Sequence, residues 1–155
     1  MSCDDLIAYC GLYCGDCHGH QQKIPDLARD LRKELRTQRY DLFANMASEK
    51  GFNKDLADYD TCYRVLGAMV KFRCNKACRP GGGPPFCKMR ACCQKKEYEG
   101  CWECDVFETC DKLDFLRDVH GDAHIKNLRR LRKNGTKAFV KGKHEWYSKP
   151  KKRQS

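Results

Sequence analysis

Cysteine is the residue of this sequence whose number and spacing point to chemistry. The chain has 13 cysteines in 155 residues, and two pairs, Cys14/Cys17 and Cys101/Cys104, have two residues between them. Two thiolates at this spacing can turn inward on one loop and occupy two corners of a tetrahedron around a metal ion. One such pair is weak evidence because thioredoxin-like redox motifs share it. Two pairs with further cysteines around them indicate metal binding.

The sequence leaves the identity of the metal open. Cys10-x3-Cys14-x2-Cys17 has the spacing by which radical enzymes hold a [4Fe–4S] cluster, but the chain is too short and too poor in strands for their partial barrel. An ordinary [4Fe–4S] cluster completed by a distant cysteine is the alternative to the zinc ion that we expect. Thiol catalysis through the vicinal pair Cys92-Cys93 is a third hypothesis, and it requires a lowered thiol pKa.

The amino-terminal residues predict the compartment. They show no positively charged start, apolar stretch and small-residue cleavage site of the kind that marks export. The longest apolar run, residues 65–70, is far too short to span a membrane. We therefore expect a cytoplasmic protein without a membrane segment, where clustered thiols bind metal rather than form disulfides.

Positive charge is concentrated at the carboxy-terminal end of the chain. The net charge is +10, and residues 126–155 hold twelve Lys/Arg and one acidic residue, so this segment alone contributes +11 and residues 1–125 contribute −1. We expect a contact with an acidic protein or a nucleic acid through residues 126–153, because basic side chains bind phosphates and interleaved aromatic residues stack on bases. The aromatic candidates are Phe139, Trp146 and Tyr147.

No constellation of catalytic residues is recognisable. Gly81-Gly82-Gly83 lacks the Lys-Ser/Thr and the helix of a phosphate-binding loop. His120 and His124 flank Asp122, which we interpret as a helix cap rather than as part of an active site. The sequence therefore predicts no catalytic residues and favours a binding protein over an enzyme.

Hydrophobic periodicity predicts a mainly α fold. Leu27, Leu31, Leu35, Leu42 and Met46 fall on one side of a predicted helix over about residues 25–50, and a second helix is expected over about 53–72. The periodicity disappears in residues 72–113, where cysteines recur, apart from a short helix over about 88–97. A helix from Asp122 to Asn134, with Ile125, Leu128 and Leu131 inward, should end before Gly135.

These elements predict a small helical domain with metal-held loops and little or no sheet. We expect a cysteine-rich metal-binding domain at 1–121, a basic helical extension at 122–147 and a disordered basic tail at 148–155. Residues 72–113 contain few apolar side chains, so we expect them to need metal in order to fold.

The cysteine pattern resembles an uncharacterised prokaryotic family catalogued as domain of unknown function 3795. The resemblance covers residues 7–115 and rests on Cys10-Gly-Leu-Tyr-Cys14-Gly-Asp-Cys17 and on the stretch from Cys74 to Leu113. It implies a metal-binding module without an established activity. The metal ligands that it implies are Cys10, Cys14, Cys17, Cys74, Cys78, Cys87, Cys92, Cys101, Cys104 and Cys110. Cys3, Cys62 and Cys93 lie outside the pattern, and Cys93 competes with its neighbour Cys92.

Overall fold

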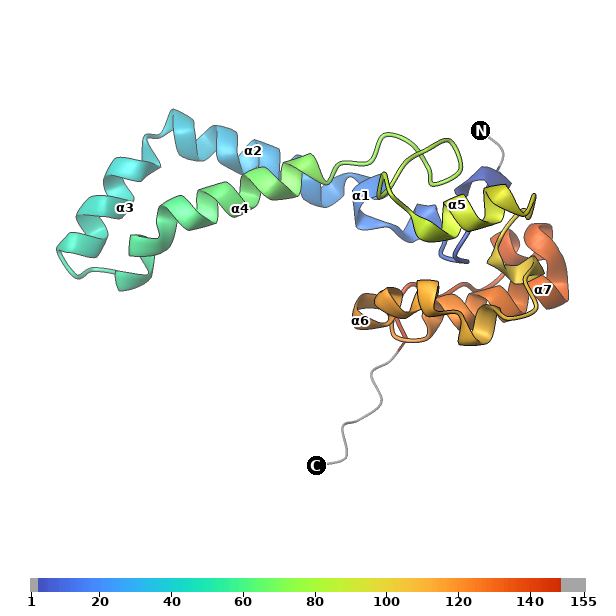
Figure 1. Cartoon of the computed structure of the whole chain (residues 1–155). Helices are drawn as coiled ribbons and strands as arrows, with labels where there is room; N and C mark the ends of the chain where they lie inside the picture. The colour runs from blue at the N-terminus through green and yellow to red at the C-terminus, as the bar shows by residue number, and fades with distance from the viewer. Residues whose placement is uncertain (1–2, 149–155) are drawn as a thin grey trace, which may run out of the picture. The chain divides into compact units, whose positions relative to one another are not determined.

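The computed structural model describes residues 3–148, with side chains from residue 5 onward, and divides the chain into two compact units (Figure 1). Unit 1 consists of residues 1–20 and 75–155, and unit 2 consists of residues 21–74. The described residues form helices and turns, with one isolated bridge between Ile7 and Tyr13 and no strand. The predicted mainly α fold is confirmed.

Unit 2 is a helical hairpin. Its elements are α2 (Lys23–Thr37), α3 (Tyr40–Glu49), the 3₁₀ helix η3 (Lys54–Asp58) and α4 (Tyr59–Lys71). α2 and α4 run antiparallel, since Asp26 near the start of α2 pairs with Arg73 beyond the end of α4, and Arg32 lies over the ring of Tyr63. The helix predicted over 25–50 is two helices, because Arg39 adopts a left-handed conformation with φ of 50°.

The large apolar side chains of unit 2 are mostly exposed. Leu27, Leu31 and Leu42, which the periodicity predicts on the buried side, are 60, 49 and 56% exposed. The fully buried residues of this unit are all small or compact. They are Pro25, Ala28, Ala44 and Ala47. The periodicity therefore marks an amphipathic helix correctly, but the described residues do not cover its apolar side.

Unit 1 contains short helices joined by turns. Its α-helices are α1 (His18–Gln21, which ends at the first residue of unit 2), α5 (Lys88–Lys95), α6 (Arg117–His120) and α7 (Ala123–Lys141). The 3₁₀ helices are η1 (Cys3–Leu6), η2 (Cys14–Asp16), η4 (Cys101–Glu103), η5 (Phe107–Thr109) and η6 (Asp111–Leu116). The predicted short helix over 88–97 corresponds to α5.

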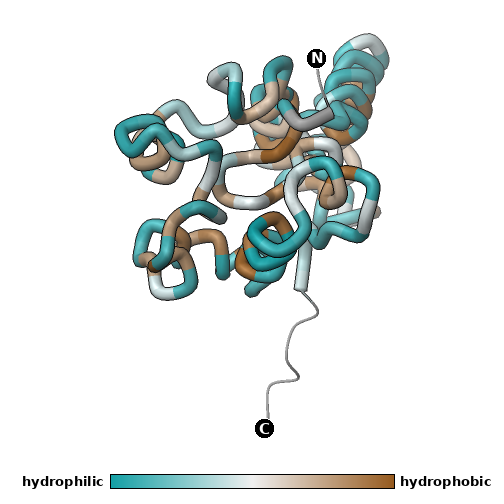
Figure 2. Tube along the Cα trace, turned by 90° about the vertical axis from the view of Figure 1, so that its right-hand side faces the viewer, coloured by the Kyte–Doolittle hydropathy of each residue, from teal (hydrophilic) through white to brown (hydrophobic). Residues whose placement is uncertain are grey.

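The hydrophobic core lies in unit 1, where Figure 2 shows brown segments surrounded by teal ones. The amino-terminal segment, the cysteine-rich region and α7 all contribute to it. Its buried members include Ile7, Leu12, Met89, Cys93, Cys101, Trp102, Phe107, Leu113, Leu128 and Leu131. The cysteine-rich region thus supplies more of the core than its composition predicts, because Met89, Trp102 and Phe107 are almost fully buried.

α7 is the main helix of this core. Ile125, Leu128 and Leu131 are buried as predicted, with exposures of 6, 0 and 2%. Gly135 interrupts the helix with φ of 78° and ψ of 168°, a backbone conformation that a residue with a side chain rarely adopts. The helical segment predicted to end before Gly135 does so, and a further segment, which carries the buried Phe139, follows the kink.

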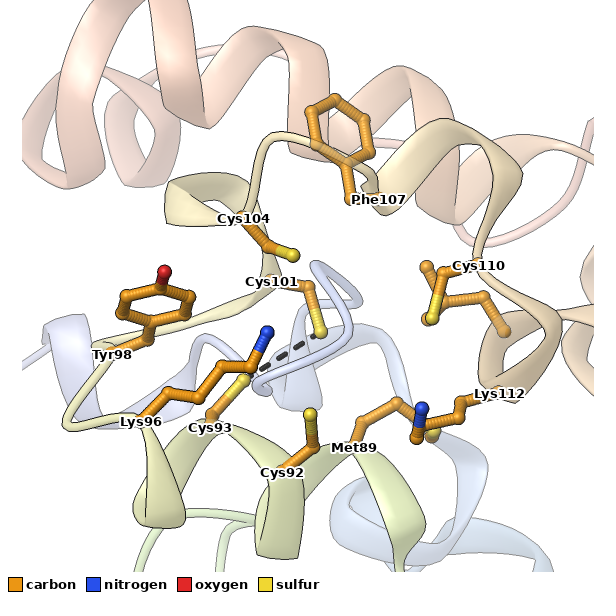
Figure 3. Close-up of a pocket in the computed structure, with 11 residues that line it drawn as sticks. Met89, Cys92, Cys93, Lys96, Tyr98, Cys101, Cys104, Phe107, Cys110 and Lys112 are labelled. Atoms are coloured by element: carbon orange, nitrogen blue, oxygen red, sulfur yellow. Dashed lines mark hydrogen bonds between the residues drawn. The ribbon is translucent and has the colours of Figure 1, made fainter.

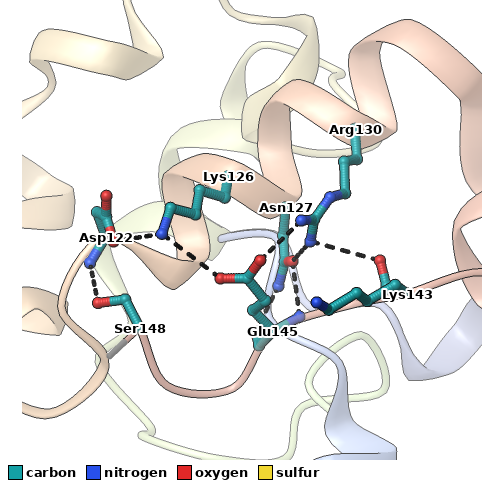
Figure 4. A network of polar contacts seen from close by, with 7 residues as sticks. All are labelled: Asp122, Lys126, Asn127, Arg130, Lys143, Glu145 and Ser148. Carbon is teal, nitrogen blue, oxygen red and sulfur yellow. Dashed lines mark hydrogen bonds and ion pairs between the residues drawn. The ribbon is translucent and has the colours of Figure 1, made fainter. Parts of the chain in front are cut away.

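A strap formed by residues 143–148 returns along α7 (Figure 4). The buried side chain of Asn127 donates to the carbonyl of Glu145 at 2.7 Å and accepts from its amide at 2.9 Å. The carboxylate of Glu145 pairs with Arg130 at 2.7 Å. Ser148 donates its amide to the carbonyl of His120, and its Oγ accepts from the amide of Asp122. Ser148, the first residue of the predicted disordered tail, is therefore held against unit 1, and the rest of that predicted tail, residues 149–155, lies outside the described residues.

No helix of residues 3–148 is long and apolar enough to cross a membrane.

Replacing Asn127 by Ala should destabilise unit 1 by about 2–3 kcal/mol, because the amide and carbonyl of Glu145 would both lose a buried partner. Urea unfolding monitored by Trp fluorescence would measure the change. The control is Asn134→Ala on the exposed side of the same helix, which should change stability by less than about 0.5 kcal/mol. Equal effects of the two substitutions would show that the strap contributes nothing specific.

Candidate metal centre

A first cluster of thiols forms where the amino-terminal loop meets the loop before α5. It consists of Cys10, Cys14, Cys78 and Cys87. Burial raises the pKa of Cys10 to about 12, and the nearby thiols of Cys78, Cys87 and Cys14 act in the same direction. Burial also raises the pKa of Cys78, and the nearby thiol of Cys87 raises it further. Three other thiols therefore lie close enough to Cys10 to influence its charge, and Cys87 also influences the charge of Cys78.

A second cluster lines a small pocket between α5 and the turns that follow it (Figure 3). Its members are Cys92, Cys93, Cys101, Cys104 and Cys110. The pocket has a volume of about 30 Å³, and its other lining residues include Met89, Phe107 and Leu113. Five thiols therefore share one apolar depression that has room for one or two water-sized groups.

The sulfur atoms of Cys93 and Cys101 in the second cluster lie 3.7 Å apart. Sulfur atoms at two corners of a tetrahedron, each about 2.3 Å from a central zinc ion, are about 3.8 Å apart. The pKa of Cys101 is raised by its hydrogen bond to Cys93 and by burial, while the same hydrogen bond lowers the pKa of Cys93. The two sulfur atoms are thus in hydrogen-bond contact at the spacing of neighbouring zinc ligands.

The two Cys-x2-Cys pairs have the same local structure. Cys14 and Cys101 each begin a one-turn 3₁₀ helix, η2 and η4. Cys17 and Cys104 end these turns with extended backbones, at φ/ψ of −73/124° and −83/128°. The amide of the second cysteine donates to the carbonyl of the first at 3.0 Å and 3.1 Å. The second cluster therefore contains both cysteines of one tight turn, as in zinc knuckles, and the first cluster contains Cys14, the first cysteine of a matching turn.

The model of DUF3795, a family described as a protein of unknown function, matches residues 6–115. The chain belongs to this family. The matched range contains both turns and all ten cysteines on which the resemblance rests. No curated protein and no solved structure matches the chain. The DUF3795 match thus establishes the family, and the geometry of its thiols is the evidence on the chemistry.

Most of the ten predicted ligands of the DUF3795 module fall in or beside the two clusters. The second cluster contains Cys92, Cys101, Cys104 and Cys110. Cys17 lies on the same turn as Cys14, and the backbone carbonyl of Cys74, in unit 2, accepts from Gln22. Cys93 is the residue that the sequence pattern sets aside, and its burial beside Cys101 was not readable from spacing. Cys62, which also lies outside the pattern, is exposed on α4.

The described thiols lie near one another, but they are not arranged around a common point. Within residues 3–148, no three Cys, His, Asp or Glu side chains are arranged so that they could hold a metal ion as they stand. Thiolate sulfur is nevertheless the donor that zinc and iron–sulfur clusters prefer. The donor chemistry of both clusters therefore fits the expected groups.

Arg90 fixes the Gly/Pro-rich loop between two residues of the first cluster, Cys78 and Cys87. Its guanidinium donates to four backbone carbonyls at 2.8–3.2 Å. These carbonyls belong to Cys78, Gly82, Pro84 and Pro85. Gly82 allows the loop to close, because a Cβ atom there would lie 1.7 Å from the carbonyl oxygen of Lys76. One side chain on α5 thus positions two thiols of this cluster.

Positive side chains near both clusters favour thiolates. Arg79 and Lys96 lower the pKa of Cys93, after the larger effects of its hydrogen bond and burial. Arg90 and Arg79 lower the pKa of Cys78, although burial outweighs them. The side chain of Arg79 is held by hydrogen bonds to the carbonyls of Ile7 and Glu99. A fixed cation near two clusters offsets part of the negative charge that four thiolates leave on a zinc ion.

The histidines form no second candidate site. His18 is exposed, and His120 uses Nδ1 in a hydrogen bond with the carbonyl oxygen of Trp146 at 2.7 Å. His124 is fully buried without a partner for either ring nitrogen, and burial lowers its pKa to about 4, so it is neutral in the core. Asp122 precedes α7 as predicted, but its side chain pairs with Lys126 instead of capping the helix.

Part of the basic carboxy-terminal charge is neutralised within unit 1. Arg129, Arg130 and Arg132 form ion pairs, and their partners are Glu108, Glu145 and Asp105. Phe139 is buried and Trp146 packs against His120, whereas Tyr147 is 60% exposed. Of the three aromatic residues expected to stack on a partner, Tyr147 alone has a largely exposed side chain.

Replacing Arg90 by Lys should loosen the loop of residues 79–87, because an ammonium group cannot reach four carbonyls in the plane of a guanidinium. We expect amide exchange in this loop to rise at least about tenfold, which corresponds to about 1.4 kcal/mol. The control is Arg129→Lys, which replaces an exposed guanidinium bound to Glu108 and should leave this loop unchanged. Unchanged exchange in Arg90→Lys would contradict the positioning role of Arg90.

Proposed function

We propose that this chain is a cytoplasmic metal-binding module in which zinc held by the two thiol clusters fixes the loops of unit 1. The observation that carries the proposal is the gathering of thiols from distant segments into two clusters. One contains both cysteines of a Cys-x2-Cys turn, and the other contains the first cysteine of a matching turn. None of the cysteines whose side chains are described is in a disulfide, which agrees with a reducing compartment.

The second cluster favours zinc over a cubane iron–sulfur cluster. A mononuclear ion takes all four thiolates on one atom, so their sulfurs sit at the edges of a small tetrahedron. Each iron of a [4Fe–4S] cluster takes one cysteine, so the four cysteine sulfurs are held farther apart. The 3.7 Å between the sulfur atoms of Cys93 and Cys101, and the small pocket beside them, suit a single ion. An iron–sulfur cluster in either place remains the alternative.

The module would act by presenting a surface rather than by catalysis. Lys133, Lys137, Lys141 and Lys143 are exposed near the carboxy-terminal end. These lysines could contact an acidic protein or a nucleic acid, while the neighbouring arginines are engaged in ion pairs. The role of zinc in this proposal is to keep α7 and the loops under it in one arrangement.

Metal analysis of protein purified without oxygen tests the proposal directly. We expect a colourless protein with up to two zinc ions per chain. A brown protein with broad absorption near 400 nm and bound iron would establish the alternative. Removal of the metal by a chelator should unfold the cysteine-rich part of unit 1 and leave the helical signal of α2 and α4, because metal binding is folding free energy for such loops. Unchanged circular dichroism and amide exchange after complete metal removal would refute a structural metal.

Single Cys→Ser variants should separate ligands from other thiols. We expect Cys104→Ser and Cys93→Ser to lose about one metal ion per chain, since Cys104 ends a turn and Cys93 faces Cys101. The matched control is Cys62→Ser, because Cys62 is exposed on α4. Cys92→Ser separates the vicinal pair and should retain more metal than Cys93→Ser, because Cys93 is the buried member. Equal metal loss in all four variants would show that the thiols are wrongly assigned.

A further inference from the structure

The hairpin of unit 2 carries an apolar side that the other residues of unit 2 leave open. Ile24, Leu27 and Leu31 recur at helical spacing along α2 and are 48, 60 and 49% exposed. Met69 on α4 is 39% exposed, and Leu66 is half-buried. Every fully buried residue of this unit is Ala or Pro, so α2 and α4 have almost no hydrophobic core between them.

The apolar residues of the two helices lie on the same side of the hairpin. Successive residues of a helix are rotated by about 100°, so Ile24, Leu27 and Leu31 lie about 90° from Ala28 and Arg32. Arg32 faces α4, since it contacts Tyr63 and the space at Gly67. On α4, a displacement of about 110° in the same rotational sense from Tyr63 and Gly67 leads to Cys62, Leu66 and Met69.

Equal displacement in the same sense has a simple consequence for two antiparallel helices. The sense of rotation is defined for each helix by viewing it from its own amino terminus. α2 and α4 point in opposite directions and also face each other from opposite sides of their contact, so these two reversals cancel. The two displaced stripes therefore appear on one side of the hairpin. A hairpin with such a side is half of a four-helix bundle, in which each helix packs against two neighbours.

We propose that this side of unit 2, formed by Ile24, Leu27, Leu31, Leu66 and Met69, is a dimer interface that packs against the same side of a second copy of the chain. A twofold axis brings a surface against itself, which requires that the surface be apolar or self-complementary in charge. Residues 21–74 hold eleven Lys/Arg and eight Asp/Glu, so their net charge of +3 opposes self-association only weakly.

The exposed area suits a dimer of moderate affinity. At roughly 150 Å² for a large side chain, the exposed parts of Ile24, Leu27, Leu31 and Met69 amount to roughly 300 Å². A standard interface takes about 800 Å² from each partner, and a little over half of that area is apolar. The hairpin thus offers about two thirds of the apolar area that one partner normally contributes, and a dimer built on it should dissociate on dilution.

Sedimentation of the full chain with its metal bound, over a range of concentrations, tests the proposal. We expect a reversible monomer–dimer equilibrium that Leu27→Glu and Leu31→Glu weaken at least about tenfold, because each places a charge in an apolar contact. The matched controls are Val106→Glu and Phe115→Glu, which alter similarly exposed apolar residues of unit 1 and should leave the dimer intact. Dimerisation that depends on the control residues instead would overturn the proposal.

Two further measurements complete the test, and the second uses no variant, so it stays valid if a Glu variant unfolds. A mixture of Leu27→Glu with Leu27→Lys should associate more strongly than either alone, because the new charges are then opposite. Hydroxyl-radical footprinting of the unaltered chain should show Met69 and Leu27 protected at high concentration and modified at low concentration. A chain that is monomeric at every concentration refutes the proposal. If Leu27 of that monomer is protected at every concentration, unit 1 of the same chain covers the apolar side of unit 2. If Leu27 is modified at every concentration, this side is exposed to solvent.

Discussion

The structure of unit 1 depends on cysteine side chains that are both part of the core and candidate metal ligands. Cys93 and Cys101 are buried among Met89, Trp102 and Phe107, so any charge on their sulfurs must be compensated inside an apolar environment. Protonation achieves this in the metal-free state, as the raised pKa values of Cys10 and Cys101 indicate. A divalent cation achieves it with thiolates. Zinc binding would thus replace the thiol protons by a metal ion, and its binding free energy would hold the cysteine-rich part of unit 1 in its folded arrangement.

The sequence is a good guide where a single residue dictates the backbone. Gly135 ends a helical segment because glycine tolerates the positive φ that the kink requires, and Ile125, Leu128 and Leu131 are buried as their spacing predicts. Prediction fails at Arg39, where an ordinary residue adopts φ of 50° and divides one expected helix into two. Periodicity also identifies the apolar side of α2 without showing what covers it.

The candidate site was predictable in its residue types but not in its grouping. Spacing identifies the Cys-x2-Cys turns, because that chemistry is local. It cannot show that Cys10 and Cys14 lie near Cys78 and Cys87, or that Cys93 faces Cys101, because those distances are set by packing. The carboxy-terminal charges pose the same problem. The ion pairs of Arg129 and Arg132 with acidic residues more than twenty positions earlier are invisible to a count of charges.

The two units solve the stability problem of a small domain in different ways. A short chain buries too little surface for a large hydrophobic core, so it needs a covalent, metal or oligomeric constraint. Unit 1 has thiol clusters available for metal, whereas unit 2 has one cysteine on α4 and another at its end, together with an apolar side. Metal cannot therefore organise the hairpin as it could organise the loops. Packing against another surface is the remaining way to stabilise the hairpin. Such packing would explain why large apolar residues lie away from the contact between α2 and α4.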